Sequence, residues 1–222
     1  MGPDHYINAR NAMVASIAER NGLCGNVLEA MRSVPRHEFV PDYNRYLAYA
    51  DRPVSIGHNA TISQPYMVAF MTDAADVTDA ERVLEVGTGS GYQAAVLAAL
   101  GANVFTVEII AELAERARVD LARLGYVNVA VKTGDGYSGW AENAPYDAIL
   151  VTAAAPMIPT PLVRQLAEHG RLIVPVGDAY EAQMLKVYEK IDGLLALRKT
   201  IPVRFIPMTG RVAAKAVSTL HA

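Results

Sequence analysis

Three closely spaced glycines, Gly87, Gly89 and Gly91, form the segment of this sequence best suited to hold a ligand. They follow the apolar run Arg82–Val86, which reads as a buried strand, so they predict a loop at the carboxyl end of that strand. The dinucleotide fingerprint G-x-G-x-x-G would need its last glycine at position 92, which is Tyr92. No G-x-x-x-x-G-K-[ST] phosphate loop occurs either. The spacing therefore disfavours a nicotinamide dinucleotide and excludes a Walker-type nucleotide site.

Acidic residues stand near the ends of three predicted strands. Glu85 lies at the end of the first strand, where open α/β sheets bind ligands, and its charge suits a cofactor with ammonium and sulfonium groups rather than a pyrophosphate. Glu108 ends the second strand and can accept the protons of both ribose hydroxyls. Asp135, between two glycines after the third strand, is placed to border an adenine ring. Any one acid could be a helix cap or a solvated charge, but the three in order favour S-adenosyl-L-methionine.

A serine just upstream of the first strand is the best candidate for contact with a substrate. Ser63 precedes Pro65, and proline is favoured in the first turn of a helix. Helix amino termini attract carboxylates, and a hydroxyl there can donate a further hydrogen bond. The alternative is that Ser63 only caps the helix. The residues alone leave both interpretations open.

Short β-like runs alternate with helical stretches from residue 82 onward, which predicts an α/β fold with a mostly parallel, doubly wound, Rossmann-like sheet. The predicted strands are Arg82–Val86, 104–107, 127–131, 147–151 and 171–176, and the predicted helices are 92–100, 110–124 and 161–169. Runs 183–189 and 195–201 flank Asp192-Gly193 and predict a C-terminal antiparallel hairpin. Helices are also predicted at 12–20 and 27–33, before a stretch punctuated by proline and glycine at 34–65. We expect one domain over residues 1–222, with 1–80 as a helical cap covering substrate and cofactor and 81–222 as the cofactor-binding core.

The composition narrows the classes of function. The net charge is −3 and 19% of the residues are charged, without the basic stripe of a nucleic-acid-binding protein. Cys24 is the only cysteine, so the chain has no internal disulfide, and no His or Cys pair has the spacing of metal ligands. The sequence has neither a secretory signal nor a run of membrane-spanning length. We expect a cytoplasmic monomer without a metal, bound to neither membrane nor nucleic acid.

Several stretches resemble the protein-L-isoaspartate O-methyltransferases. The similar segments are 31–41, 60–65, 83–93, 134–140, 144–156 and 170–177, and their order and spacing hold from Val27 to Gly210. The segment around Ser63 is diagnostic, because other methyltransferases share the glycine loop but lack this insert. Bacterial members often read Gly-Gln-Thr where this chain has Asn59-Ala60-Thr61, which puts in doubt how the substrate backbone is held. The residues after Gly210 match nothing in the family.

The resemblance implies an activity and a set of site residues. The family transfers the methyl group of S-adenosyl-L-methionine to the free α-carboxylate of L-isoaspartyl residues in damaged proteins or peptides, with D-aspartyl residues left open as acceptors. The ester then closes to a succinimide, and its hydrolysis returns some aspartate. Ser63 matches the family's active-site serine, and Pro207-Met208-Thr209 resembles its closing segment. The residues matched to cofactor contacts are Ile62, Gln64, Pro65, Tyr66, Met67, Glu85, Gly87, Thr88, Gly89, Ser90, Gly91, Glu108, Ile109, Gly134, Asp135, Gly136 and Thr209.

The chemistry of such a transfer agrees with the residue types present. A carboxyl group with a pKa of about 4 is already ionised at neutral pH, so an in-line displacement at a sulfonium methyl needs no general base. Three alternatives stay open on the sequence alone. A carboxylate methyltransferase of this fold could act on an aspartate of a dedicated precursor peptide. The others are a nicotinamide-dependent oxidoreductase and a binding module without turnover.

Overall fold

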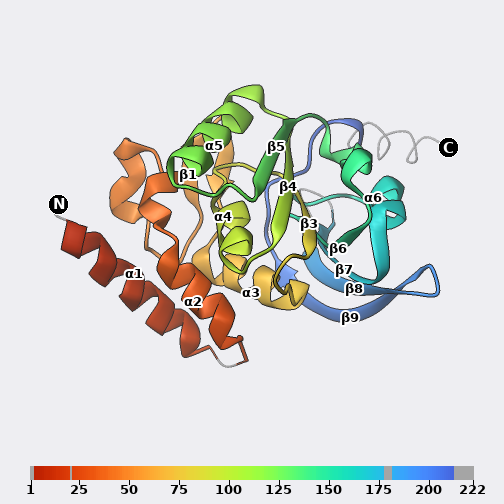
Figure 1. The fold of residues 1–222 in the computed structure, drawn as a ribbon, viewed down its shortest axis with the longest axis horizontal. Helices are drawn as coiled ribbons and strands as arrows, with labels where there is room; N and C mark the ends of the chain where they lie inside the picture. Colours follow the sequence, from red (N-terminus) through yellow and green to blue (C-terminus); the bar gives the residue numbers. More distant parts are fainter. Residues whose placement is uncertain (1–2, 21, 178–181, 213–222) are drawn as a thin grey trace.

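The computed structural model describes residues 3–20, 22–177 and 182–212, and its centre is a seven-stranded sheet of order β5-β4-β3-β6-β7-β8-β9 (Figure 1). Its strands are β3 (Arg82–Val86), β4 (Asn103–Glu108), β5 (Val129–Thr133), β6 (Tyr146–Val151), β7 (Leu166–Val176), β8 (Gln183–Ile191) and β9 (Leu194–Val203). Strands β3 to β7 are parallel, whereas β8 and β9 are antiparallel to their neighbours. The predicted α/β class with a C-terminal antiparallel hairpin is confirmed.

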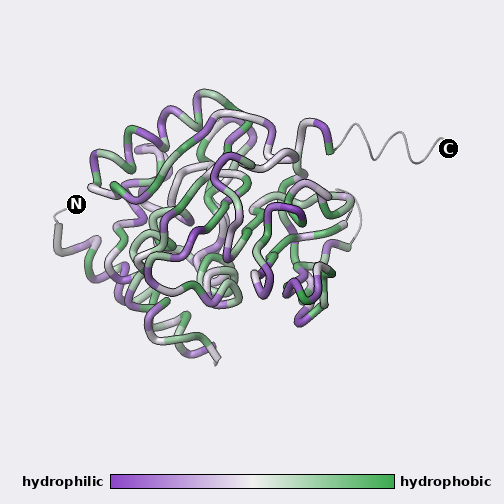
Figure 2. Tube along the Cα trace, turned by 45° about the vertical axis from the view of Figure 1, so that its right-hand side comes forward, coloured by the Kyte–Doolittle hydropathy of each residue, from purple (hydrophilic) through white to green (hydrophobic). Residues whose placement is uncertain are grey.

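Helices cover both faces of this sheet. They are α1 (Pro3–Ala18), α2 (Gly25–Ser33), α3 (Pro65–Ala75), α4 (Tyr92–Ala99), α5 (Ala111–Arg123) and α6 (Thr160–Gln165), with short 3-10 helices η1 (Arg36–Phe39), η2 (Asp42–Leu47), η3 (Gly136–Ser138) and η4 (Ala141–Asn143). Successive strand residues point to opposite faces. Val83 accordingly packs in one buried cluster with α3 and α4, while Leu84 packs in another with α6. The outer helices mix hydrophilic and hydrophobic residues (Figure 2), as expected for helices with one face on the core.

The N-terminal part packs against the helices of the core. Val14 of α1 and Met31 of α2 are fully buried in one cluster with Leu113 of α5, and both helices lie at the opposite end of the molecule from β8 and β9 (Figure 1). Residues of the N-terminal part and of the core therefore belong to one buried cluster, and the single domain stays a prediction. None of the helices in the described ranges is long and apolar enough to cross a membrane.

A small antiparallel hairpin in the N-terminal part was not predicted. Strands β1 (Val54–Gly57) and β2 (Ala60–Ile62) pair with each other and form a separate two-stranded sheet. The two residues between them, His58 and Asn59, have φ angles of 52° and 56°. Positive φ at both central residues is the geometry of a type I′ turn, which matches the twist of the flanking strands.

Several predicted boundaries differ from the observed ones. The helix predicted at 161–169 ends at Gln165, because the chain from Leu166 onward pairs with β6 as part of β7. Strand β5 begins two residues later than predicted, because Val127 is in a turn and 96% exposed. Helix α1 begins at Pro3 rather than at residue 12.

The order of the strands creates a crevice at their carboxyl ends. The chain proceeds from β3 to β4 and β5 on one side, and then crosses to β6 on the other side of β3. Connections that leave neighbouring parallel strands in opposite directions open a crevice, and ligands bind there in α/β proteins. The residues that end β3, β4 and β6 are therefore positioned to line a site.

Candidate active site

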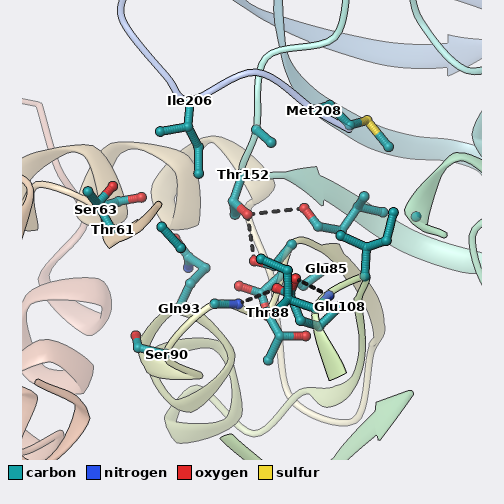
Figure 3. Close-up of a pocket in the computed structure, with 18 of the residues that line it drawn as sticks. Thr61, Ser63, Glu85, Thr88, Ser90, Gln93, Glu108, Thr152, Ile206 and Met208 are labelled. Carbon is teal, nitrogen blue, oxygen red and sulfur yellow. Dashed lines mark hydrogen bonds between the residues drawn. The ribbon is translucent and has the colours of Figure 1, made fainter. Parts of the chain in front are cut away.

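A cavity of about 390 Å³ occupies this crevice. Its walls come from the hairpin turn, the segment after β2, the loops after β3, β4 and β6, and residues 206–209. Figure 3 shows Thr61 and Ser63 on one side and Glu85, Thr88 and Glu108 gathered on another. Of the predicted site residues, the cavity lining includes Ile62, Ser63, Glu85, Gly87, Thr88, Gly89, Ser90, Glu108, Ile109, Gly136 and Thr209. Residues far apart in the sequence are thus brought together around one space.

The glycine loop has a backbone that glycine alone adopts easily. Gly87 and Gly89 have φ angles of +100° and +53°, in the region that residues with a side chain rarely enter. A Cβ atom at Gly87 would lie 2.4 Å from Oγ1 of Thr152. That hydroxyl donates hydrogen bonds to the carbonyl oxygens of Gly87 at 2.6 Å and of Val86 at 3.0 Å. Thr152 therefore fastens the loop to the end of β6, and the fit requires a glycine.

We expect Gly87→Ala to distort this loop and weaken cofactor binding. The new methyl group would meet Thr152, and the strained φ adds about 1–3 kcal/mol. Calorimetric titration with S-adenosylhomocysteine should show a loss of affinity. Gly193→Ala is the matched control, because Gly193 has φ +78° in the β8–β9 turn and a Cβ atom there would have no neighbour within 4 Å. The control should lower the melting temperature and keep the affinity. Equal affinity of Gly87→Ala and the native protein would contradict the role of the loop.

Glu85 is a fully buried carboxyl group at the carboxyl end of β3. Its Oε2 atom accepts a hydrogen bond of 2.6 Å from Oγ1 of Thr106, and that hydroxyl is in turn 2.6 Å from Oγ1 of Thr88. Its Oε1 atom has no hydrogen-bond partner in the described part of the chain. Burial raises the pKa of Glu85 to about 8, with the nearby Glu108 contributing in the same direction. A cation in the cavity would provide the missing interaction.

Glu108, in contrast, is held by backbone amides. Its Oε2 atom accepts a hydrogen bond of 2.8 Å from the amide of Gly89, and Oε1 accepts one of 3.0 Å from the amide of Ile110. These bonds connect the end of β4 to the glycine loop. Each carboxylate oxygen has further acceptor capacity, so Glu108 can hold the loop and still accept from a ligand's hydroxyl groups. The contact of Glu108 with a ribose stays a prediction.

Ser63 lies between β2 and α3 and lines the cavity. Its carbonyl oxygen accepts a hydrogen bond of 2.7 Å from Nη2 of Arg36. Its hydroxyl forms no hydrogen bond with another described residue. The N-cap of α3 is Gln64, and the amide of Tyr66 in the first turn is bound at 2.9 Å by Oδ1 of Asp51. Ser63 is therefore not the helix cap, and its hydroxyl is available to a ligand.

Seven predicted contacts do not line the cavity, namely Gln64, Pro65, Tyr66, Met67, Gly91, Gly134 and Asp135. The side chain of Gln64 donates to Asp51 instead. Gly91 packs against α5, where a Cβ atom would lie 3.2 Å from Leu121. The carboxylate of Asp135 accepts from the amides of Tyr137 and Arg211 and so connects η3 to the segment after β9. Their contact with a bound cofactor remains a prediction.

Other lining residues were not assigned to the site from the sequence. Thr152 is a polar residue directly after a predicted strand, the same signal that identified the acids, so it could have been found. Gln93 lies in the first turn of α4 and had no local signal. Ile206 reaches the cavity because the amide of Ala154 donates to its carbonyl oxygen at 2.8 Å. The further unassigned lining residues are His58, Val68, Val86, Tyr92, Val107, Ile110 and Ala153. The lining also includes Asn59, Ala60, Thr61, Pro207 and Met208, which the resemblance had placed in segments beside the substrate or cofactor.

Asp147 and Trp140 make structural contacts near the site. Asp147 accepts a hydrogen bond of 2.8 Å from the amide of Arg82 at the entrance of its strand. Trp140 packs edge-on against Phe105 of the sheet and is not part of the cavity lining. No group of three or more His, Cys, Asp or Glu residues could hold a metal ion in the ranges that the structure describes.

Comparison with known proteins agrees with the family resemblance seen in the sequence. Residues 8–213 match the family model described as protein-L-isoaspartate(D-aspartate) O-methyltransferase. A protein-L-isoaspartate O-methyltransferase of Gloeobacter violaceus is 58% identical over 183 residues, which are 82% of this chain and 89% of the relative. Protein-L-isoaspartate O-methyltransferase 1 of Cupriavidus necator is 52% identical over 92% of this chain and 80% of its own.

Solved structures agree in fold over nearly the whole chain. A protein-L-isoaspartate O-methyltransferase superposes with a TM-score of 0.85 and 31% identity, covering 91% of this chain and 67% of the other. A putative member from Plasmodium falciparum, solved with S-adenosyl-L-homocysteine, has a TM-score of 0.79 and 25% identity over 90% of this chain and 98% of the other. The likeness therefore includes the N-terminal part as well as the sheet.

Proposed function

The chain belongs to the protein-L-isoaspartate(D-aspartate) O-methyltransferase family, and we propose that it transfers the methyl group of S-adenosyl-L-methionine to the free α-carboxylate of L-isoaspartyl residues in damaged proteins or peptides. The observation that carries this proposal is the arrangement of the cavity. Glu85, whose Oε1 atom is buried without a partner in the described part of the chain, belongs to the cavity lining, and Ser63 with its free hydroxyl lines another side of the same space. A cationic cofactor and an anionic acceptor can therefore each meet a suitable group.

The residues around the glycine loop fit S-adenosyl-L-methionine, which when bound supplies a methyl group on a positively charged sulfur. Glu85 provides a buried negative charge for the cation once its carboxyl group ionises. Glu108 offers acceptor oxygens to the ribose hydroxyls while it holds the amide of Gly89. Gly136 lets η3 pack closely against Val86 in the cavity wall, because a Cβ atom there would lie 2.4 Å from the Val86 side chain. We propose that these residues bind the cofactor.

On the opposite side, Ser63 aims the acceptor. We propose that its hydroxyl donates a hydrogen bond to one oxygen of the substrate carboxylate, which leaves the other oxygen directed at the methyl group. A carbon–oxygen bond forms as the carbon–sulfur bond breaks, so a methyl ester and a neutral thioether result and no proton moves. Catalysis then depends on alignment and on exclusion of water, and alignment alone can contribute about 7–11 kcal/mol. The ester closes to a succinimide without the enzyme, which begins repair.

The paired-peptide assay tests this function. Two peptides that differ only in aspartate or isoaspartate at one position are offered with methyl-labelled cofactor. We expect label in the isoaspartyl peptide alone, because only there is the α-carboxylate free. Label in the aspartyl peptide would instead support the alternative acceptor, an aspartate in a dedicated precursor peptide. No label in either peptide would contradict the proposal.

Three finer expectations belong to the same proposal. We infer that the enzyme acts in the cytoplasm as a monomer on many damaged proteins. The mixed charge of the chain, with a net charge of −3, supports protein substrates rather than nucleic acid. A D-aspartyl peptide added to the assay decides whether that residue is also an acceptor.

A further inference from the structure

A buried arginine contacts the Ser63 turn, which is the segment 62–66 that connects β2 to α3. Arg36 of η1 is fully buried, which is rare for an arginine without an ionic partner. Its Nε atom donates to the carbonyl oxygen of Ala48 at 2.7 Å, and Nη2 donates to the carbonyl oxygen of Ser63 at 2.7 Å. Its guanidinium lies 4.7 Å from the centre of the Tyr92 ring, and Tyr92 lines the cavity. Within the described ranges Arg36 forms no ion pair, so its contacts are carbonyls and one aromatic ring.

The other end of the same turn is held by a different residue. Asp51 accepts hydrogen bonds from the side chain of Gln64 at 3.0 Å and from the amide of Tyr66 at 2.9 Å. Arg20 binds the same carboxylate at 2.5 Å. Asp51 thus fixes the start of α3, whereas Arg36 contacts the residue that lines the cavity. The turn is restrained on both sides of Ser63.

We propose that Arg36 is a positioning residue for methyl transfer, which holds the Ser63 carbonyl from behind the cavity and thereby sets where the Ser63 hydroxyl meets the acceptor carboxylate. Rigid placement matters in this reaction because the proposed catalysis depends on alignment of the carboxylate with the methyl group. A displacement of about 1 Å can lower the rate about 10²-fold. Burial lowers the pKa of Arg36 to about 10, so the guanidinium remains charged at neutral pH. The proposal rests on the proposed function, because Ser63 must act on the acceptor.

A double-mutant cycle with Ser63 tests the role. Arg36→Lys keeps the charge but replaces the planar fork with a single ammonium group, which cannot reach both carbonyls in the same geometry. We expect kcat for the isoaspartyl peptide to fall about tenfold, with unchanged affinity for S-adenosylhomocysteine. In the Ser63→Ala background the same change should lower kcat by less than about twofold, because the group that it positions is gone. If Arg36→Lys does not fold, Arg36→Gln keeps a neutral donor and enters the same cycle.

Arg116 supplies the matched control. Its Nη1 atom donates to the carbonyl oxygen of Ile56 in β1 at 3.0 Å, so it also ties a side chain to the hairpin backbone, but it does not contact the Ser63 turn. Arg116→Lys should leave kcat unchanged in both backgrounds. The positioning role is overturned if the Arg36 substitution lowers kcat by the same factor with and without the Ser63 hydroxyl. It is also overturned if weaker cofactor binding accounts for the lower activity. A native enzyme that labels neither peptide overturns the proposed function, and this inference with it.

Discussion

Ser63→Ala should lower kcat for an isoaspartyl peptide by about 10²-fold or more and leave the affinity for S-adenosylhomocysteine nearly unchanged. The hydroxyl makes no hydrogen bond with a described residue, so its removal leaves no buried partner unsatisfied. The loss should appear in the chemical step, because the methyl group and the carboxylate oxygen would no longer be held in line. Single-turnover kinetics with labelled cofactor, combined with calorimetric titration, separates the two effects.

Ser55→Ala is the control for this variant. Ser55 is an exposed residue of β1, in the hairpin that precedes Ser63, and it does not line the cavity. Its replacement should change neither rate nor affinity. If Ser63→Ala keeps the native kcat, then Ser63 has no part in aligning the acceptor, and the proposed role of Arg36 fails as well.

Glu85→Gln should weaken binding of S-adenosyl-L-methionine by about 10²-fold at mildly alkaline pH, since a charge partner commonly shifts a pKa by about 1–3 units. In the ligand-free protein the pKa of Glu85 is raised to about 8 by burial, so the carboxyl group is mostly protonated at neutral pH. A bound cation favours the ionised form, and binding must then release a proton. The native affinity should therefore rise about tenfold per pH unit up to about pH 8 and then level off. This slope should be absent in Glu85→Gln.

Ionisation of Glu85, which should strengthen cofactor binding, should lower the stability of the ligand-free protein. Because its folded pKa of about 8 exceeds the ordinary value of 4.5, the folded state binds the proton more tightly than the unfolded state does. Stability should therefore fall by about 1.4 kcal/mol for each pH unit between these two values. Above about pH 8 the ligand-free Glu85→Gln variant should melt at a higher temperature than the native protein. Calorimetry in buffers of different ionisation enthalpy measures the released proton. Equal affinities and equal melting temperatures would show that the charge of Glu85 is not used.

Local patterns in the sequence predicted the sheet and most of the cofactor side of the cavity. Strand β3 was predicted with its observed limits because its apolar run is followed at once by glycine. Glu85 and Glu108 were found because parallel strands end at one edge of a sheet, so position along the chain translates directly into position in space.

The features that the sequence did not predict depend on distant partners. Leu166 lies in a strand because it pairs with Tyr146, whereas its local spacing suited a helix. The hairpin before Ser63 turns through His58-Asn59, which lacks the glycine that usually marks such a turn. Arg36 gave no signal for its contact, because its partner is a backbone carbonyl 27 residues away. The pairing of Leu166 and the contact of Arg36 each depend on a residue distant in the sequence, so a short stretch of sequence could not predict them.

Residues 206–209 are part of the cavity wall, which determines when the cavity can be completed during synthesis of the protein chain. These residues follow β9, the last strand in the described ranges, and the amide of Met208 donates to the carbonyl oxygen of Ala154 at 2.7 Å. A nascent chain that has left the ribosome only as far as β8 contains the residues of β3, the glycine loop and Ser63, but it lacks this wall. If the cofactor contacts this wall, we expect tight binding only after residues 206–209 have emerged. A ligand that binds only the folded protein stabilises it by RT ln(1 + [L]/Kd), so a cofactor held by this wall is expected to stabilise the protein more as its concentration rises above Kd.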